Sequence, residues 1–100
     1  MSGLIGFRLE LSAMNWSVYI IICSDGSLYT GISTDVARRF RQHQTGKGAK
    51  YFRGRQPLAI AYQENGYTRS HASHREITIK KMPRLEKQAL IKITGLTSQN

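Results

Sequence analysis

The chain has few of the residues that stabilise secreted domains or span membranes. Its single cysteine, Cys23, excludes an internal disulfide and is typical of a reducing, cytoplasmic protein. No apolar run approaches the roughly 20 residues of a membrane-spanning helix, and we expect no membrane partner. Residues 1–13 lack the basic start of a signal peptide, and charged residues interrupt their apolar stretch. We therefore expect an N-terminal extension over residues 1–13, one domain over residues 14–95 and a tail over residues 96–100.

Acidic residues are also scarce, because 6 Asp and Glu face 15 Lys and Arg, which gives a net charge of +9. This excess indicates a polyanionic partner. The basic residues gather in a stretch without Asp or Glu, which contains Arg38, Arg39, Arg41, Lys47, Lys50, Arg53 and Arg55. Tyr51 and Phe52 lie among them and could stack on bases. Such a run is usually only a solvated surface, and acidic membranes or ribosomal RNA would attract it too, so it does not by itself identify the partner.

Two tyrosines, Tyr19 and Tyr29, flank a turn at Ser24-Asp25-Gly26. This triplet fits a three-residue hairpin loop with its glycine in the left-handed conformation. That loop would pair Ile21 with Tyr29 and Tyr19 with Gly31, and it would place both tyrosines on one face, about 7–8 Å apart. A two-residue loop would shift the register by one and send them to opposite faces. Strand tyrosines usually pack in a core, so the hairpin alone does not indicate a functional site.

A helix is expected directly after the hairpin. Residues 33–35 supply capping side chains, and an apolar stripe begins at Val36. Arg39 and His43 are four residues apart beside this stripe, so they should project from the edge of the buried face toward the sheet. Gly46 is the residue type that favours a left-handed helix end. A solvated basic face remains an equal interpretation of Arg39 and His43.

The second half of the chain predicts one strand and two helices. Residues 58–62 fit a strand, and residues 64–66 fit a turn that closes it. A helix should run from Thr68 to about Met82, because Pro83 fits the first turn of a following helix better than a helix interior. That last helix would place Leu85, Ala89, Leu90 and Ile93 on its apolar side and would end before Gly95.

Glu76 is the most informative residue of the second half. On the expected helix it aligns with Ala72 and Ile79, so its carboxylate projects from a stripe that should be buried. A buried charge is costly unless it is paired or bound to a metal. An ion pair with Arg39 or Arg75, which is a common arrangement, would satisfy Glu76, and the residues alone leave the metal and the ion pair open.

These residues occur in the order and spacing of a known set of motifs. From about Trp16 to Ile93 the chain resembles the GIY-YIG nuclease domain, in particular its small single-domain bacterial members, the YhbQ-like group. The resemblance rests on Ser17-Val18-Tyr19, Tyr29-Thr30-Gly31, Arg38-Arg39, His43, the stretch from Thr45 to Lys50, and Glu76 with Ile79-Lys80-Lys81. Ser17 and Val18 stand where the first motif has glycine and isoleucine.

The resemblance implies an α+β fold in which a small three-stranded antiparallel sheet is flanked by helices, in the order β-β-α-β-α-α. It implies a single Mg²⁺ or Mn²⁺ ion held by Glu76 near Tyr19 and Tyr29. One of these tyrosines would take the proton of the attacking water, Arg39 would bind the phosphate, and His43 would orient water or a tyrosine. Since free tyrosine has a pKa of about 10, Arg39 and the metal would have to lower it.

We therefore interpret the chain as a metal-dependent, endonuclease-type phosphodiesterase of nucleic acid. DNA is expected before RNA, with repair or recombination as the setting, and the basic stretch with Tyr51 would contact the substrate. The alternative is a nucleic-acid- or ribosome-binding module that keeps the scaffold without catalysis. Charge alone explains binding, whereas Tyr19, Tyr29, Arg39 and Glu76 together require chemistry. Nothing in the sequence indicates a protein partner.

Overall fold

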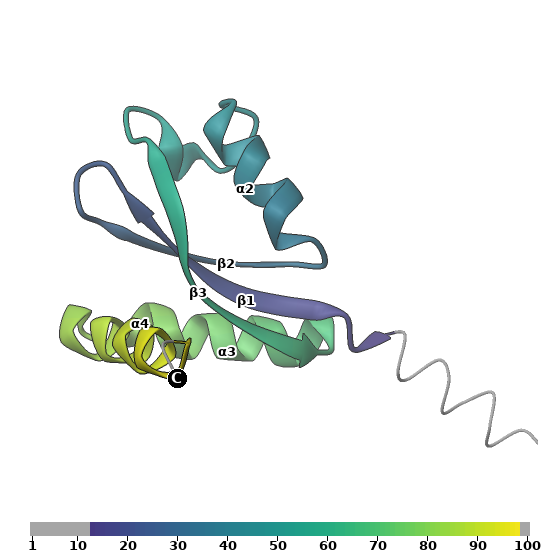
Figure 1. Ribbon diagram of the computed structural model, residues 1–100. Coiled ribbons are helices and arrows are strands. Elements are labelled where there is room, and N and C mark those ends of the chain that lie inside the picture. Colours follow the sequence, from purple (N-terminus) through teal and green to yellow (C-terminus); the bar gives the residue numbers. More distant parts are fainter. Residues whose placement is uncertain (1–12, 99–100) are drawn as a thin grey trace, which may run out of the picture.

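The computed structural model describes residues 13–98 (Figure 1). Its elements are β1 (Trp16–Cys23), β2 (Leu28–Ser33), α2 (Val36–Gln44), the single-turn 3₁₀ helix η1 (Lys50–Phe52), β3 (Pro57–Tyr67), α3 (Arg69–Lys81) and α4 (Arg84–Ser98). This confirms the predicted order of strands and helices. The predicted extension over residues 1–13 lies, except for its last residue, outside the described part, and the domain boundaries stay predictions. None of the described helices has the length and apolar character needed to cross a membrane.

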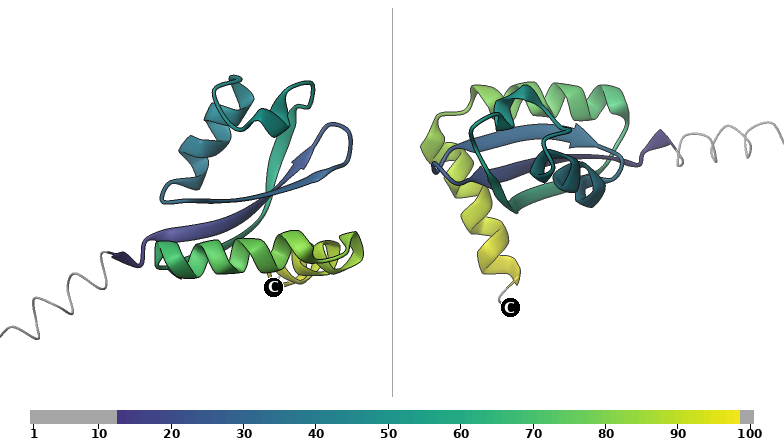
Figure 2. Two further views of the ribbon diagram at one scale, coloured as in Figure 1. Left: turned by 180° about the vertical axis from the view of Figure 1, so that it is seen from behind. Right: turned by 90° about the horizontal axis from the view of Figure 1, so that it is seen from above.

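The three strands form one antiparallel sheet in the order β2-β1-β3. Helix α2 covers one face of this sheet, and α3 and α4 lie on the other (Figures 1 and 2). Figure 2 also shows α3 running along the sheet and α4 running at a steep angle to α3. The two faces therefore carry two separate cores, joined only through the strands.

The β1–β2 hairpin has the predicted register. Ile21 pairs with Tyr29 and Tyr19 pairs with Gly31. Gly26 has a φ of 82°, and its N–H donates to the Cys23 carbonyl at 2.9 Å. This is the three-residue loop with a left-handed glycine that the sequence predicts. The loop thus brings both tyrosines to the same face of the sheet.

Alternation along β1 divides its side chains between the two cores. Tyr19, Ile21 and Cys23 pack toward α2 with Val36 and Phe52. The neighbouring residues of β1 point the other way and pack against α3, in a cluster formed by Val18, Ile20, Ala72 and Ile79. Nearly every side chain of β1 is therefore buried on one face or the other, as expected for the central strand of a covered sheet. Cys23 is a free, buried packing residue.

Strand β3 is longer than predicted, and the turn expected at residues 64–66 is wrong. Val18 pairs with Glu64 and Trp16 pairs with Tyr67, so β3 has one extra residue between these pairs. This is a β-bulge, and Gly66 accommodates it with a φ of 86°. The side chain of Asn65 accepts hydrogen bonds from Ser17 Oγ and Gln63 Nε2, both at 2.7 Å. Turn-forming residues build a bulge here because β1 continues alongside and keeps the chain paired.

Helix α3 agrees closely with its prediction. Thr68 is its N-cap, and the Thr68 Oγ1 accepts a hydrogen bond from the His71 N–H at 3.1 Å. The helix ends at Lys81, just before Pro83.

Helix α4 differs from its prediction in three respects. Pro83 precedes the helix rather than lying in its first turn, since its carbonyl accepts the N–H of Glu86 at 3.0 Å. The helix also continues through Gly95. The expected apolar side is only partly correct, because Leu90 packs on the core together with Ile91, whereas Ala89 is exposed, as are Leu85 (79%) and Ile93 (63%). Helical periodicity identified a row of apolar residues but not which section of the helix crosses the sheet.

Candidate active site

The hairpin places Tyr19 and Tyr29 side by side on the face covered by α2. Their ring centroids are 6.3 Å apart. Tyr19 is 1% exposed, and Tyr29 is half-buried. Gly31, opposite Tyr19, has no room for a side chain, because a methyl group there would lie 2.6 Å from Tyr19 Oη. The glycine of the second motif is thus required by space, so that the Tyr19 ring can lie across β2.

His43 reaches Tyr19 from α2 and is 2% exposed. The Ala49 N–H donates to His43 Nδ1 at 3.2 Å, and His43 Nε2 lies 3.1 Å from Tyr19 Oη. Because Nδ1 accepts, the neutral ring carries its proton on Nε2 and donates it to the tyrosine oxygen. A methyl group on Gly48 would lie 2.0 Å from Nδ1, so this loop can approach the ring only with glycine at that position.

The end of α2 directs this loop back over His43. Gly46 has a φ of 79°, as the predicted left-handed cap requires. Its N–H donates to the His43 carbonyl at 3.3 Å, and the Lys47 N–H donates to the Gln42 carbonyl at 2.9 Å. These two bonds form a Schellman motif. At the other end of the helix, Asp35 is the N-cap and accepts the Arg38 N–H at 3.1 Å, as predicted.

Aromatic rings surround the tyrosines and His43. The Phe52 centroid lies 4.3 Å from that of His43 and 4.8 Å from that of Tyr29. Phe52 is only 8% exposed, so the interpretation that it stacks on bases is wrong; it completes the core. Tyr51 is half-buried beside Tyr29, and the Arg55 guanidinium covers its ring at 4.2 Å. The sequence alone could not show which of these two rings packs in the core, because both lie within the basic stretch.

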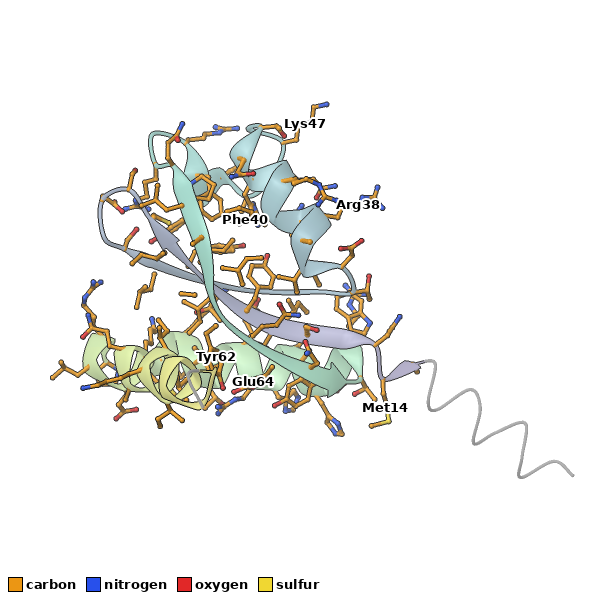
Figure 3. All side chains as sticks on the ribbon, in the orientation of Figure 1. Met14, Arg38, Phe40, Lys47, Tyr62 and Glu64 are labelled. Atoms are coloured by element: carbon orange, nitrogen blue, oxygen red, sulfur yellow. The ribbon has the colours of Figure 1, made fainter. Side chains whose placement is uncertain are left out.

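The predicted basic residues other than Arg39 differ in exposure and in their partners. Five of them are exposed on α2 and the segment after it, namely Arg38, Arg41, Lys47, Lys50 and Arg53. Figure 3 shows Arg38 and Lys47 pointing outward from this side. Arg55 differs, because its Nε lies 2.7 Å from Asp25 Oδ2. No acidic residue lies within this stretch of the sequence, but the fold places Asp25 of the hairpin loop beside Arg55.

Arg39 and Glu76 approach the tyrosines from opposite sides of the sheet. Arg39 is half-buried, and its Nη1 donates to Gln42 Oε1 at 2.9 Å. The charge of Arg39 lowers the pKa of both tyrosines, and that of Glu76 raises both. Each charged group therefore lies within electrostatic range of the two hydroxyls.

Glu76 lies on the sheet-facing side of α3, as predicted, between Ala72 and Ile79. Its side chain is 22% exposed, and its Oε1 is 3.7 Å from Lys80 Nζ. The ion pairs considered for it do not form, because Arg75 is bound to Glu64 and no contact with Arg39 is present among the described residues. An exposed pair of this length is weak, so the Glu76 carboxylate remains open to a cation.

The sequence profile of the GIY-YIG catalytic domain matches residues 15–88. The chain belongs to the GIY-YIG family. It is 45% identical to the UPF0213 protein of Desulfotalea psychrophila over 85% of this chain and 78% of that protein. It is 49% identical to the UPF0213 protein YhbQ of Salmonella typhimurium over 76% of each chain. The predicted resemblance to the YhbQ-like group is confirmed.

Solved structures support the same assignment. The solution NMR structure of the UPF0213 protein BH0048 from Bacillus halodurans aligns with a TM-score of 0.53 and 43% identity, over 82% of this chain and 87% of that one. The protein EF2693 from E. faecalis, also solved by solution NMR, aligns with a TM-score of 0.54 and 37% identity, over 80% and 85% of the two chains. The GIY-YIG family is a family of nucleases that use a divalent metal, and its fold is the one observed here.

Burial sets the protonation of this GIY-YIG site. Desolvation raises the pKa of Tyr19 and Tyr29, and Arg39 offsets this only in part. Arg39 therefore lowers the pKa of the tyrosines, as expected, but burial raises it by more, and the pKa of each tyrosine stays above its usual value. Desolvation, followed by the Arg39 charge, lowers the pKa of His43 to about 4. His43 is thus neutral at pH 7, in agreement with its hydrogen bonds.

The donor set fits magnesium or manganese better than zinc. Among the described residues no group of three or more His, Cys, Asp or Glu side chains converges, and His71 and His74 are exposed on α3. One open carboxylate is typical of Mg²⁺, which keeps several waters and takes further ligands from substrate phosphate. Glu76, whose one ion pair among the described residues is the long one with Lys80, meets this requirement.

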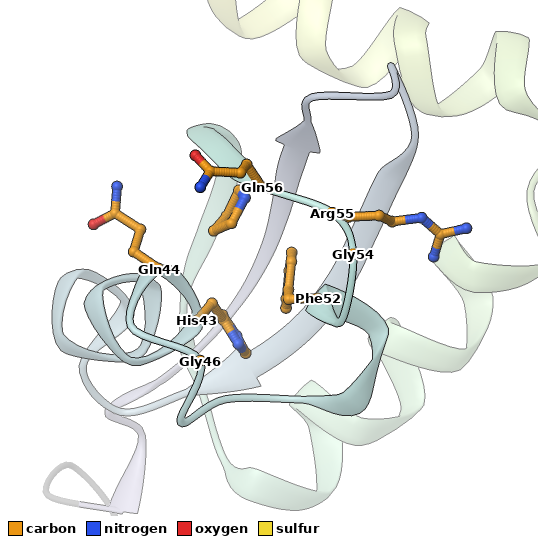
Figure 4. Close-up of a pocket in the computed structure, with 8 residues that line it drawn as sticks. His43, Gln44, Gly46, Phe52, Gly54, Arg55 and Gln56 are labelled. Atoms are coloured by element: carbon orange, nitrogen blue, oxygen red, sulfur yellow. The ribbon is translucent and has the colours of Figure 1, made fainter.

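A cavity of about 220 Å³ adjoins the site behind His43 (Figure 4). Phe52 and Pro57 contribute apolar surface, and the side chains of Gln44 and Gln56 lie at its edge. Sequence reasoning did not indicate this cavity, because it forms only where the end of α2 meets the segment before β3.

The low pKa of His43 predicts a pH-dependent stability. The pKa is about 4 when folded and about 6.5 when unfolded. Between pH 7.5 and 5.0 the unfolded chain therefore gains a proton that the folded chain does not, and the free energy of unfolding should fall by about 1–2 kcal/mol. Urea unfolding at the two pH values measures this loss. Glu64, with a pKa of about 2, contributes only at lower pH.

The matched control is the exposed His71. His71→Gln should keep the loss of stability, whereas His43→Gln should remove it. An NMR titration of the His43 ring in the unmodified protein tests the same point directly. An imidazole pKa near 6.5, or a stability loss unchanged in His43→Gln, would contradict the assignment.

Proposed function

We propose that this GIY-YIG protein is a divalent-metal-dependent endonuclease that hydrolyses phosphodiester bonds in nucleic acid, with DNA as the expected substrate. The convergence of groups from the hairpin, α2 and α3 supports this most strongly. Two phenols and a neutral imidazole are in contact, and a guanidinium and a carboxylate lie within electrostatic range of the phenols. A binding module needs only the basic surface, and these groups are costly to bury unless they have a use.

The two tyrosines suit different roles. The oxygen of Tyr19 accepts the Nε2–H of His43, so its own hydrogen is directed away from the imidazole, toward a phosphate oxygen or water. Burial raises the pKa of Tyr19 more strongly than that of Tyr29, so Tyr19 stays a phenol. Tyr29 is less perturbed, and the charge of Arg39 is the principal influence that lowers its pKa. We assign Tyr29 to removing the proton from the attacking water and Tyr19 to donating a hydrogen bond.

Arg39 and Glu76 would bind groups of opposite charge. The guanidinium of Arg39, oriented by Gln42, would bind a phosphate oxygen and stabilise the charge that develops there. Glu76 would hold Mg²⁺ or Mn²⁺, and the bound ion supplies Lewis-acid stabilisation of phosphate oxygens. His43 stays neutral at pH 7 and keeps Tyr19 in place.

The exposed basic residues on α2 and the following segment would hold the nucleic-acid backbone. Replacing Lys47, Lys50 and Arg53 together by glutamine should flatten the dependence of DNA affinity on salt, since each lost phosphate contact removes about 0.9 from the log–log slope. Fluorescence anisotropy of a labelled DNA across a salt series measures this slope. The matched control replaces Lys81, Lys87 and Lys92, on the helices across the sheet, and should leave the slope unchanged. Equal slopes in both triple variants would place the surface elsewhere.

Replacing either tyrosine by phenylalanine should reduce cleavage without changing DNA affinity. Tyr29→Phe should also keep the melting temperature, whereas Tyr19→Phe should lower it, because the buried Nε2–H of His43 loses its acceptor. General acid–base groups contribute about 10²–10⁴-fold, and we expect the larger loss for Tyr29→Phe. Because burial raises the pKa of Tyr29, the cleavage rate of the unmodified protein should rise with pH through neutral and beyond. Single-turnover cleavage of labelled DNA from pH 6 to 9 tests both statements. If both variants cleave at the unmodified rate, the tyrosines are core residues and this mechanism is wrong.

Glu76→Gln should abolish Mg²⁺-dependent cleavage and preserve DNA binding, because it removes the carboxylate charge and keeps the shape of the side chain. Cleavage of assorted DNA and RNA structures, with Mg²⁺ and then with a chelator, provides the reference. A carboxylate with a purely structural role would instead give a lower melting temperature and no specific loss of cleavage. A Glu76→Gln protein that still cleaves with Mg²⁺ would exclude the metal role, and an unmodified protein that binds but never cleaves would favour the non-catalytic module.

A further inference from the structure

The sheet-facing side of α3 is unusual because its centre is charged. Residues three and four apart share a helix face, and here that face consists of Ala72, Arg75, Glu76 and Ile79. Only Ala72 and Ile79 are fully buried, and they lie almost two turns apart. A methyl group and one isoleucine offer little resistance to rotation of the helix about its axis. Another interaction must therefore fix the orientation of α3 about its own axis.

A carboxylate on β3 holds Arg75. Arg75 Nε donates to Glu64 Oε1 at 2.9 Å and Arg75 Nη2 to Oε2 at 2.8 Å, which is the bidentate geometry. The hydroxyls of Tyr62 and Tyr67 donate to the same carboxylate. Glu64 thus accepts four hydrogen bonds, and the pair is largely shielded, with side-chain exposures of 29% for Arg75 and 15% for Glu64.

The acceptor itself is fixed in the sheet. Glu64 pairs with Val18 of the central strand and lies directly before the β-bulge. The Asn65 side chain anchors that bulge by accepting hydrogen bonds from Ser17 and Gln63. Figure 3 shows Tyr62 and Glu64 on the side of the sheet that carries α3. Arg75 is therefore bound to a rigid point at one edge of the sheet.

We propose that Glu64 and Arg75 are positioning residues that set the rotation of α3 and thereby direct the Glu76 carboxylate toward the tyrosines. Consecutive helix residues are separated by about 100° around the axis, so fixing Arg75 on β3 turns Glu76 toward the opposite side, where β2 lies. The influence of Glu76 on both tyrosines agrees with this direction. The inference rests on the proposed metal role of Glu76 and adds how that ligand is held.

The test measures Mn²⁺ affinity, which does not depend on turnover. The paramagnetic signal of free Mn²⁺ is followed while the full chain is titrated with the ion. Glu64→Gln should weaken binding by about 10-fold, as loss of an outer-shell partner typically does. The double variant Glu64→Gln/Arg75→Met has the same net charge as the unmodified protein but no bidentate pair, and it should bind Mn²⁺ as weakly as Glu64→Gln. Restoration of the unmodified affinity in the double variant would mean that only charge matters and would overturn the positioning role.

Two further variants separate positioning from general destabilisation and from loss of the ligand itself. Asp25→Asn breaks an ion pair of similar length in the hairpin loop, so its melting temperature should fall while its Mn²⁺ affinity stays unchanged; an equal loss of affinity there would make the effect one of general stability and overturn the inference. Glu76→Gln defines the affinity without the ligand. If it binds Mn²⁺ as tightly as the unmodified chain, the metal role fails together with the inference. If it loses Mn²⁺ while Glu64→Gln does not, the inference alone fails.

Discussion

The two hydrogen bonds of the His43 ring connect the parts of the molecule that form the site. One comes from the backbone after α2 and fixes the tautomer, and the other links the ring to Tyr19 on the central strand. Neither bond could form if Gly48 carried a side chain, or if Gly46 did not turn the chain back over the helix. The helix, the following segment and the hairpin are thus aligned by one buried imidazole.

Burial orders the side chains of this site, but it also opposes ionisation of the two tyrosines. It gives Tyr19 and His43 a single arrangement, since few alternatives exist for a polar ring with so little exposure. The same burial makes a phenolate costly and raises the pKa of both tyrosines. Arg39 works against this effect from α2, whereas Glu76 adds to it from α3 until a cation neutralises its carboxylate. A cation bound at Glu76 would remove that contribution and leave Arg39 opposing desolvation, which is the largest cause of the raised pKa values.

The parts of the fold that could be predicted were those decided by local chemistry. Ser24-Asp25-Gly26 determines the hairpin register because a turn of this length with glycine last has one common geometry. The same kind of residues at 64–66 misled the prediction, because a turn and a bulge both use glycine with positive φ and only the length of the neighbouring strand separates them. The Asp25–Arg55 pair joins residues 30 positions apart in sequence, and the contact of Gly48 with His43 depends on how the chain turns back over the end of α2. No local pattern encodes such contacts.

The β-bulge of β3 has a consequence for the surface of the sheet. Strand β3 is an edge strand, 11 residues long, and it exposes the apolar side chains of Leu58 and Ile60. A flat edge of that length offers free backbone groups to a strand of another chain and invites aggregation. The bulge at Asn65-Gly66 bends this edge and breaks its regular spacing of donors and acceptors. The irregularity that anchors Glu64 therefore also shortens the stretch along which a foreign strand could add to the sheet.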